Sequence, residues 1–391
     1  MFTVRRSRFL WILAALLLIL GISFEGVRRV RSGSNSWTPL PAAYTSMNIT
    51  WPGRPNPERD QIAELGSRTV PALVRIIQRR DWREWRIWEQ LRQRLPQSLG
   101  DLLPQSYVPV SERLKALWML GELGPKASEA TPALRQVARF GNATELQACA
   151  RIALAHILPD DQGALSNVVA MLVSPQQTER FYAAHESGSF IDHPGFHPDL
   201  LLPALADTDG EVRANASFSI GQFGPRATNE VPALRSLLSD PYRHVSICAA
   251  YSLARIDPST AAECTDAVVN ALKRSADLSG IIAPSFFAAA GPKAIGALPY
   301  LENALTSGPG PLSSSSVAMA LWHVTGKATP AMFTVLTRID QATPETVSAL
   351  GALGPAASNA IPRLRHLSQS AATPAVRRAA TEALQAIEVA R

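Results

Sequence analysis

Apolar and small residues recur every three or four positions in short segments along most of this chain. In the stretch 209–240 the spacing of one helical face relates Val212, Ala216, Ile220 and Phe223. Gly224 suits the left-handed residue that closes a helix, and Pro225 prevents the helix from continuing. Pro232 lacks a backbone donor, so it fits the first turn of a second helix. The pattern predicts a unit of helix, tight Gly-Pro turn and helix.

The same Gly-Pro turn signal occurs four times, at Gly124-Pro125, Gly224-Pro225, Gly291-Pro292 and Gly354-Pro355. In every copy an alanine follows the glycine by three residues, and a second proline follows it by eight. The last three of these second prolines are separated by 67 and 63 residues, or about two units of roughly 32 to 34 residues. Such a period is typical of stacked helix pairs that bury their apolar faces against their neighbours. We therefore predict an all-α solenoid of about nine or ten helix pairs over residues 58–391.

These residues resemble HEAT-like repeats, in particular the short type of phycobilisome-lyase-related proteins. The resemblance rests on the Val-Arg start of the first helix, seen at Val212-Arg213 and Val376-Arg377, on the Gly-Pro turn and on the Pro-x-Leu second helix. It covers about residues 58 to 388. The resemblance implies a binding scaffold, because most proteins with such repeats are scaffolds and only a few are enzymes.

The amino-terminal end predicts export. Residues Phe9 to Ser23 carry no charge and follow Arg5, Arg6 and Arg8. This apolar stretch spans about 24 Å, which is short of the ~20 residues of a comfortable membrane helix. We prefer an uncleaved signal anchor over residues 1–31, with a cleaved signal peptide and a buried terminal helix as alternatives. Residues 32–57 are rich in Ser, Pro, Gly and Asn and are interpreted as a flexible tether.

The net charge of +6 does not indicate nucleic-acid binding. Residues 1–31 hold six Arg and one Glu, and the remaining residues hold 32 basic and 31 acidic side chains. A protein that follows a phosphate backbone needs a basic stripe, and only 75–94 offers a local one. We therefore expect no nucleic-acid partner.

The three cysteines have no metal-like spacing. Cys149 and Cys248 fall among alanines on expected helices, so we interpret them as small buried residues. A disulfide between Cys248 and Cys264 is an alternative in an oxidising compartment.

Residues 185–199 hold three of the seven histidines and interrupt the repeat. The turn from this first helix to Pro203 is about four residues longer than the standard one. Enlarged turns on solenoids often carry binding groups. The weak metal candidates are His185, Glu186, His193 and His197. Their spacing matches no standard site, and a polar recognition loop is the preferred reading.

Deoxyhypusine hydroxylase, an enzyme with the same type of repeat, places several His-Glu dipeptides on successive helices to hold two irons. This sequence contains one such dipeptide, His185-Glu186. A single dipeptide cannot build that site, so this activity is not expected.

A tryptophan cluster lies near the predicted tether, at Trp82, Trp85 and Trp88. Its indoles are best explained as a cap on the open end of the first repeats. The alternatives are a partner hot spot and a patch that lies against lipid headgroups.

Three arginines, Arg135, Arg235 and Arg365, each follow a second-helix proline by three residues. The resemblance places second helices on the concave side of the array, where these residues could recognise an acidic ligand. A solvated helix face is the preferred reading.

Together these features predict a membrane-tethered scaffold that binds an unknown protein partner on the exported side of the membrane, or a secreted one if the segment is cleaved. We expect neither a cofactor nor an enzymatic activity. The alternative is a metal- or cofactor-dependent, lyase-like enzyme built on the same repeats.

Overall fold

The structure, a computed structural model, describes residues 66–78, 110–141, 143–273, 282–306, 314–327, 344–371 and 374–389. The chain divides into two units, Met1–Asn48 and Ile49–Arg391, and every described residue belongs to the second. Within these ranges all regular elements are helical, as the sequence predicts. None of the helices in these ranges is long and apolar enough to span a membrane. The predicted hydrophobic helix at 9–23, the tether and the tryptophans Trp82, Trp85 and Trp88 lie outside the described residues.

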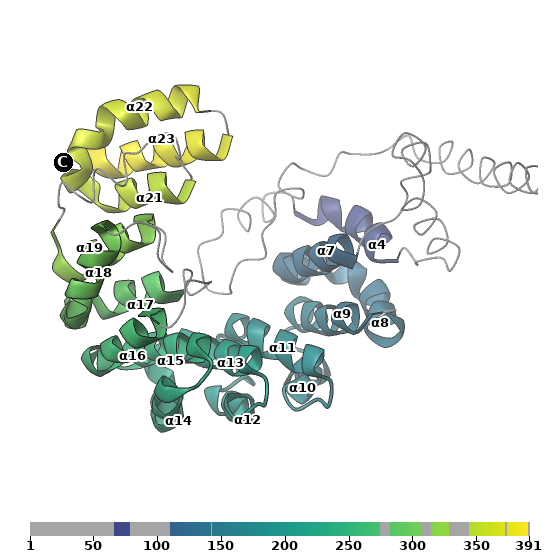
Figure 1. Cartoon of the computed structure of the whole chain (residues 1–391). Helices are drawn as coiled ribbons and strands as arrows, with labels where there is room; N and C mark the ends of the chain where they lie inside the picture. Colours follow the sequence, from purple (N-terminus) through teal and green to yellow (C-terminus); the bar gives the residue numbers. More distant parts are fainter. Residues whose placement is uncertain are drawn as a thin grey trace, which may run out of the picture. The chain divides into compact units, whose positions relative to one another are not determined.

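Helix pairs follow one another along the chain (Figure 1). The first helices are α7 (Val110–Leu123), α9 (Thr144–Ile157), α11 (Gln177–Glu186), α13 (Gly210–Gln222), α15 (Arg243–Ile256), α17 (Ile282–Ala290), α19 (Ser314–Thr325), α21 (Pro344–Ala352) and α23 (Pro374–Val389). The second helices are α4 (Val70–Gln78), α8 (Thr131–Phe140), α10 (Gln162–Met171), α12 (Leu202–Leu205), α14 (Val231–Ser236), α16 (Ala261–Lys273), α18 (Leu298–Thr306) and α22 (Ile361–Ser370). Seven complete pairs lie within the described ranges, beginning with α7/α8 and ending with α21/α22. The predicted total of nine or ten helix pairs includes residues outside these ranges, so the total stays a prediction.

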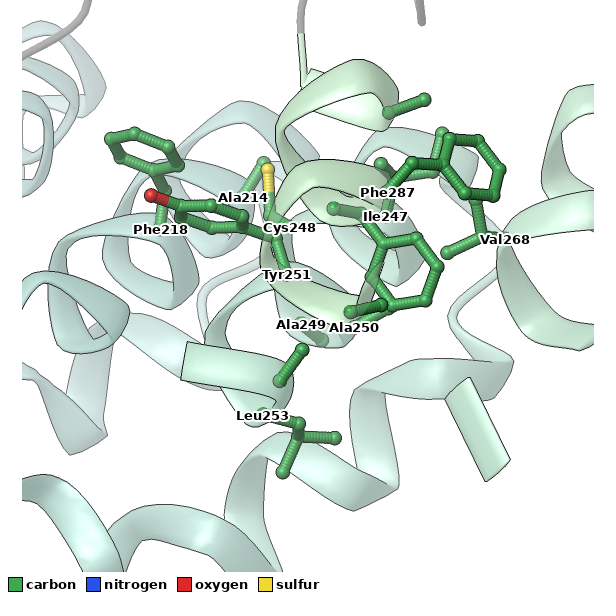
Figure 2. Close-up of a cluster of buried hydrophobic side chains, with 14 of the residues drawn as sticks. Ala214, Phe218, Ile247, Cys248, Ala249, Ala250, Tyr251, Leu253, Val268 and Phe287 are labelled. Atoms are coloured by element: carbon green, nitrogen blue, oxygen red, sulfur yellow. The ribbon is translucent and has the colours of Figure 1, made fainter. Parts of the chain in front are cut away.

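Each first helix packs against the first helix of the next unit, from α7 through to α23. Second helices such as α8 and α14 pack against the first helix of the following unit. The core therefore continues from one unit to the next, as expected for a solenoid. In α15, every residue from Val245 to Ala254 is buried. Figure 2 shows Phe218 and Tyr251 on one side of this helix, stacked at 5.1 Å, and Phe287 and Val268 on the other.

The Gly-Pro turns have the conformation that the sequence predicts. The glycines at 124, 224, 291 and 354 have φ values of 55°, 56°, 55° and 55°. Each turn then continues as a seven-residue 3-10 segment: η2 (Gly124–Ala130), η5 (Gly224–Glu230), η8 (Gly291–Ala297) and η10 (Gly354–Ala360). The recurring alanine forms a kink within it, with φ −100° and ψ 29° at Ala227, and it is fully buried in all four copies. A larger side chain would have no space there, which explains the alanine.

The Val-Arg signature is a structural device at the start of the first helix. Asp209 caps α13 by accepting bonds from the backbone N–H groups of Glu211 and Val212 at 2.9 and 3.1 Å. Arg213 then donates to the carbonyl oxygen of Asp207, at 2.7 Å. The same bond over six residues recurs from Arg180 to Ser174 and from Arg377 to Ala371. In these three first helices, α11, α13 and α23, the arginine therefore ties the helix to the segment that leads into it.

Cys149, Cys248 and Cys264 are free thiols. Cys248 and Cys264 are fully buried on α15 and α16, in agreement with the interpretation of Cys248 as a small core residue. The alternative of a Cys248–Cys264 disulfide is not what the structure contains.

Candidate functional site at the enlarged turn

The turn between α11 and α12 is longer than the other turns within helix pairs that the structure describes, as the sequence predicts. It runs through η3 (Ser187–Ser189), an irregular stretch from Phe190 to His197, and η4 (Pro198–Leu201). Phe190 occupies the place that Phe223 has in the following unit, and both side chains are buried. The helix therefore ends as in the following unit, and the additional residues follow Phe190. We call residues 187–201 the enlarged turn.

Aromatic packing fixes the enlarged turn to the core. Phe190 and Phe196 are only 3% and 2% exposed. The ring of Phe190 stacks on His156 of α9 with 4.3 Å between centroids, and Phe196 stacks on Phe223 at 6.3 Å. The sequence indicates the length of this turn but gives no sign that two phenylalanines would anchor it.

Hydrogen bonds fasten the enlarged turn to the units on both sides. His193 Nε2 lies 2.7 Å from the carbonyl oxygen of Pro159 in the preceding unit. Arg226 of the following unit donates to the carbonyl oxygen of Ile191 at 2.9 Å. Ser189 Oγ also lies 3.0 Å from His156 Nε2. A segment held from two directions keeps its shape, so whatever it displays is preorganised for binding.

The exposed residues of the enlarged turn are polar or small. Asp192 and Pro194, between the two buried phenylalanines, and His197 and Asp199, after the second of them, are exposed to solvent. Two of these four side chains are carboxylates, and within the described residues no ion pair involves either of them. The outer surface of the turn therefore offers negative charge and a histidine to a partner.

The weak metal candidates make separate contacts. His185 Nδ1 lies 2.9 Å from Glu186 Oε1, and the His185 ring stacks on Phe181. His193 instead contacts Pro159, and His197 is exposed on the turn. Across the described ranges, no three His, Cys, Asp or Glu side chains are placed to hold a metal ion.

A cluster that sequence reasoning missed lies beside His185, where α9 meets α11. Burial raises the pKa of the Cys149 thiol, and the carboxylates of Glu186 and Glu145 raise it further. Burial likewise raises the pKa of Tyr182 to about 12, with smaller contributions from Cys149, Glu145 and Glu186. Both groups therefore stay protonated at neutral pH, and Cys149 is a poor nucleophile.

Glu230 is a second residue that sequence reasoning missed. It ends the 3-10 segment η5, and it is only 4% exposed although it is a glutamate. The equivalent residues in the other three copies are Ala130, Ala297 and Ala360, all buried. The sequence itself shows this exception: of the four residues that end the Gly-Pro turns, three are alanine and one is glutamate. The segment η5 packs against η4 of the enlarged turn.

The three second-helix arginines are exposed, and each pairs with an acid of the next unit. Arg135 lies 3.8 Å from Asp161, Arg235 lies 2.8 Å from Glu263, and Arg365 lies 3.0 Å from Glu388. Their charges are thus partly offset by these neighbours. Recognition of an acidic ligand by this set stays a prediction.

The chain was compared with protein families, with solved structures and with curated proteins. Residues 198–278 match the model of the HEAT repeats family. Among solved structures, the complex of CpcE and CpcF of phycocyanin lyase from Nostoc sp. PCC7120 is 23% identical over 56% of this chain and 93% of that one, with a TM-score of 0.39. An engineered protein is 17% identical over 85% and 89% of the two chains, with a TM-score of 0.33. The Kap95:Nup1 complex is 12% identical over 95% and 53%, with a TM-score of 0.41. A search of curated proteins finds no match.

Proposed function

Since this chain is a HEAT-like repeat protein, we propose that it is a scaffold that binds a protein partner through the enlarged turn. One observation carries this proposal: the turn breaks the repeat, is fastened to the units before and after it, and still exposes polar residues. A turn that served only to join two helices would not need residues beyond the standard length. Rigid display of polar groups from a packed array is how solenoids present binding surfaces.

We further propose that the segment 1–31 anchors the scaffold in a membrane and that the repeats lie on the exported side. The apolar stretch 9–23 and the arginines before it support this arrangement. A partner would then be a protein of that compartment or of the membrane surface. Cleavage of the segment would release the same scaffold in secreted form.

The proposal is tested by crosslinked affinity capture of the full-length chain from its native membranes. Deleting the turn would remove Phe190 and Phe196 from the core, so the informative variant changes only exposed groups: Asp192→Asn, His197→Ala and Asp199→Asn together. The matched control is Lys126→Ala with Glu129→Ala, two exposed positions of the standard turn η2. A partner captured by the wild type and the control and lost from the triple variant supports the proposal. Equal capture by all three proteins contradicts it.

A further inference from the structure

Glu230 departs from the residue that the other three Gly-Pro turns have at this position. Three of the four Gly-Pro turns end in a buried alanine, and the one that adjoins the enlarged turn ends in a buried glutamate. An alanine would fill this position without any polar group to satisfy. Burying a carboxylate costs free energy unless something compensates its charge. The glutamate therefore opposes stability at a place where the repeat has a ready alternative.

Among the described residues, no basic side chain forms an ion pair with the Glu230 carboxyl group. Its Oε2 atom is buried without a hydrogen-bond partner among the described residues. Arg226, the basic residue of the same turn, is engaged with the carbonyl oxygen of Ile191 and with the ring of Phe223. Burial raises the pKa of Glu230, its own backbone N–H partly opposes this, and the charge of Asp199 raises the pKa further. In the part of the chain that the structure describes, the site therefore contains two carboxyl groups on segments that pack together, and no basic side chain is paired with Glu230.

Asp199 is the exposed member of this pair of carboxyl groups. Asp199 lies in η4, which packs against η5, and its own side chain is exposed. A cation that reaches Asp199 from solvent thus comes next to the buried Glu230. The described residues supply no third His, Cys, Asp or Glu side chain to complete the ligand set of a metal ion. An organic cation that brings its own hydrogen-bond donors fits this arrangement better than a bare metal ion.

We propose that Asp199 and Glu230 form a binding site for a lysine side chain of a protein partner. An ammonium group carries three donors on a slender stem, and it can reach one buried oxygen while it also pairs with an exposed carboxylate. A planar guanidinium binds best to two oxygens of one carboxylate in a single plane, whereas the Oε2 atom of Glu230 is fully buried and suits a narrower donor group. This inference rests on the proposed scaffold function and names the chemistry that the partner presents to it.

The test is calorimetric titration of the folded protein with blocked pentalysine, with blocked pentaarginine as the competing probe. Glu230→Ala restores the residue that the other three turns carry, so this variant is expected to fold, which circular dichroism checks. We expect pentalysine to bind the wild type at least about tenfold more tightly than it binds Glu230→Ala, the change expected from one charged hydrogen bond. Glu129→Ala, an exposed glutamate in the equivalent turn η2, should bind like the wild type.

Equal affinity of the wild type and Glu230→Ala for pentalysine would overturn the lysine site. Tighter binding of pentaarginine, or binding of Ca²⁺ alone that is lost in Glu230→Ala, would overturn it in favour of another cation. Failure of the scaffold function is seen separately, as the absence of a captured partner. A partner captured equally by the wild type and Glu230→Ala would leave the scaffold standing and remove this site from it.

Discussion

Arg213 donates two parallel hydrogen bonds to the carboxylate of Asp240, which lies just before the next first helix. They run from Nε to Oδ2 and from Nη2 to Oδ1, and both are 2.9 Å long. The same guanidinium also holds the carbonyl oxygen of Asp207. Arg180 repeats the arrangement one unit earlier, with the carboxylate of Asp207. Each arginine thus joins its own first helix to the segment before that helix and to the segment before the next first helix. Its side chain is largely buried. These bidentate bonds set the contact between neighbouring units.

The ion pair between Arg213 and Asp240 should contribute to the stability of the fold. Arg213→Ala leaves the buried Asp240 carboxylate without its partner and the carbonyl oxygen of Asp207 without its donor. We expect a loss of about 2 kcal/mol in the free energy of unfolding, measured by urea denaturation. Arg235→Ala is the control, because the Arg235–Glu263 pair is about half exposed and should contribute less than about 1 kcal/mol. Similar losses in the two variants would contradict this role.

Close packing between first helices gives a second prediction. A Cβ atom on Gly221 would lie 2.8 Å from the Cα atom of Ser252, so Gly221→Ala should force α13 and α15 apart. We expect destabilisation of about 1–3 kcal/mol from overpacking, despite the better helix propensity of alanine. Gly121→Ala has the matching position in α7 but meets Ala153 only at 3.5 Å, and it should be tolerated. Thermal unfolding of both variants decides the matter, and a Gly221→Ala protein as stable as the wild type would disprove the argument.

The raised pKa of Glu230 predicts how stability depends on pH. A carboxyl group with a folded-state pKa above its unfolded value stabilises the fold below the unfolded pKa, and this contribution is lost as the pH rises through the folded pKa. Relative to Glu230→Ala, the wild type should therefore lose stability as the pH rises from the ordinary glutamate pKa of about 4.3 towards neutral. The midpoint of thermal unfolding, followed by circular dichroism across this range, measures the difference. A constant difference at all pH values would show that Glu230 does not change its protonation there.

The Asp207 carboxyl group should respond in the opposite direction. Burial alone would raise its pKa, but the bonds from Arg180 and from the backbone of Asp209 outweigh this and lower the pKa below its usual value. Its contribution is present above the unfolded pKa and is lost as the pH falls through the folded pKa. Asp207→Asn should therefore destabilise the protein at neutral pH and much less in strong acid. Equal destabilisation at both ends of the pH range would contradict the pairing.

The repeat unit could be predicted closely because its signals are local. Gly224 and Pro232 fix a backbone conformation and a helix start that depend on a few neighbouring residues. The ion pairs between units could not be predicted, because Arg213 and Asp240 are 27 residues apart and drift in repeat length hides their register. The sequence predicts an enlarged turn at 185–199, whereas the anchoring of this turn by Phe190 and Phe196 depends on tertiary packing. The sequence shows a glutamate at position 230 where the other three turns have alanine. That this glutamate is buried depends on tertiary packing and could not be predicted.

Site-specific photocrosslinking tests the central claim most directly. The full-length chain would carry p-benzoylphenylalanine at His197 on the enlarged turn or, as the control, at Glu129 on the standard turn η2, both exposed. After irradiation in native membranes, we expect a crosslinked protein partner from position 197 and none from position 129. Crosslinks from both positions alike, or from neither, would contradict the claim that the enlarged turn is where this scaffold holds its partner.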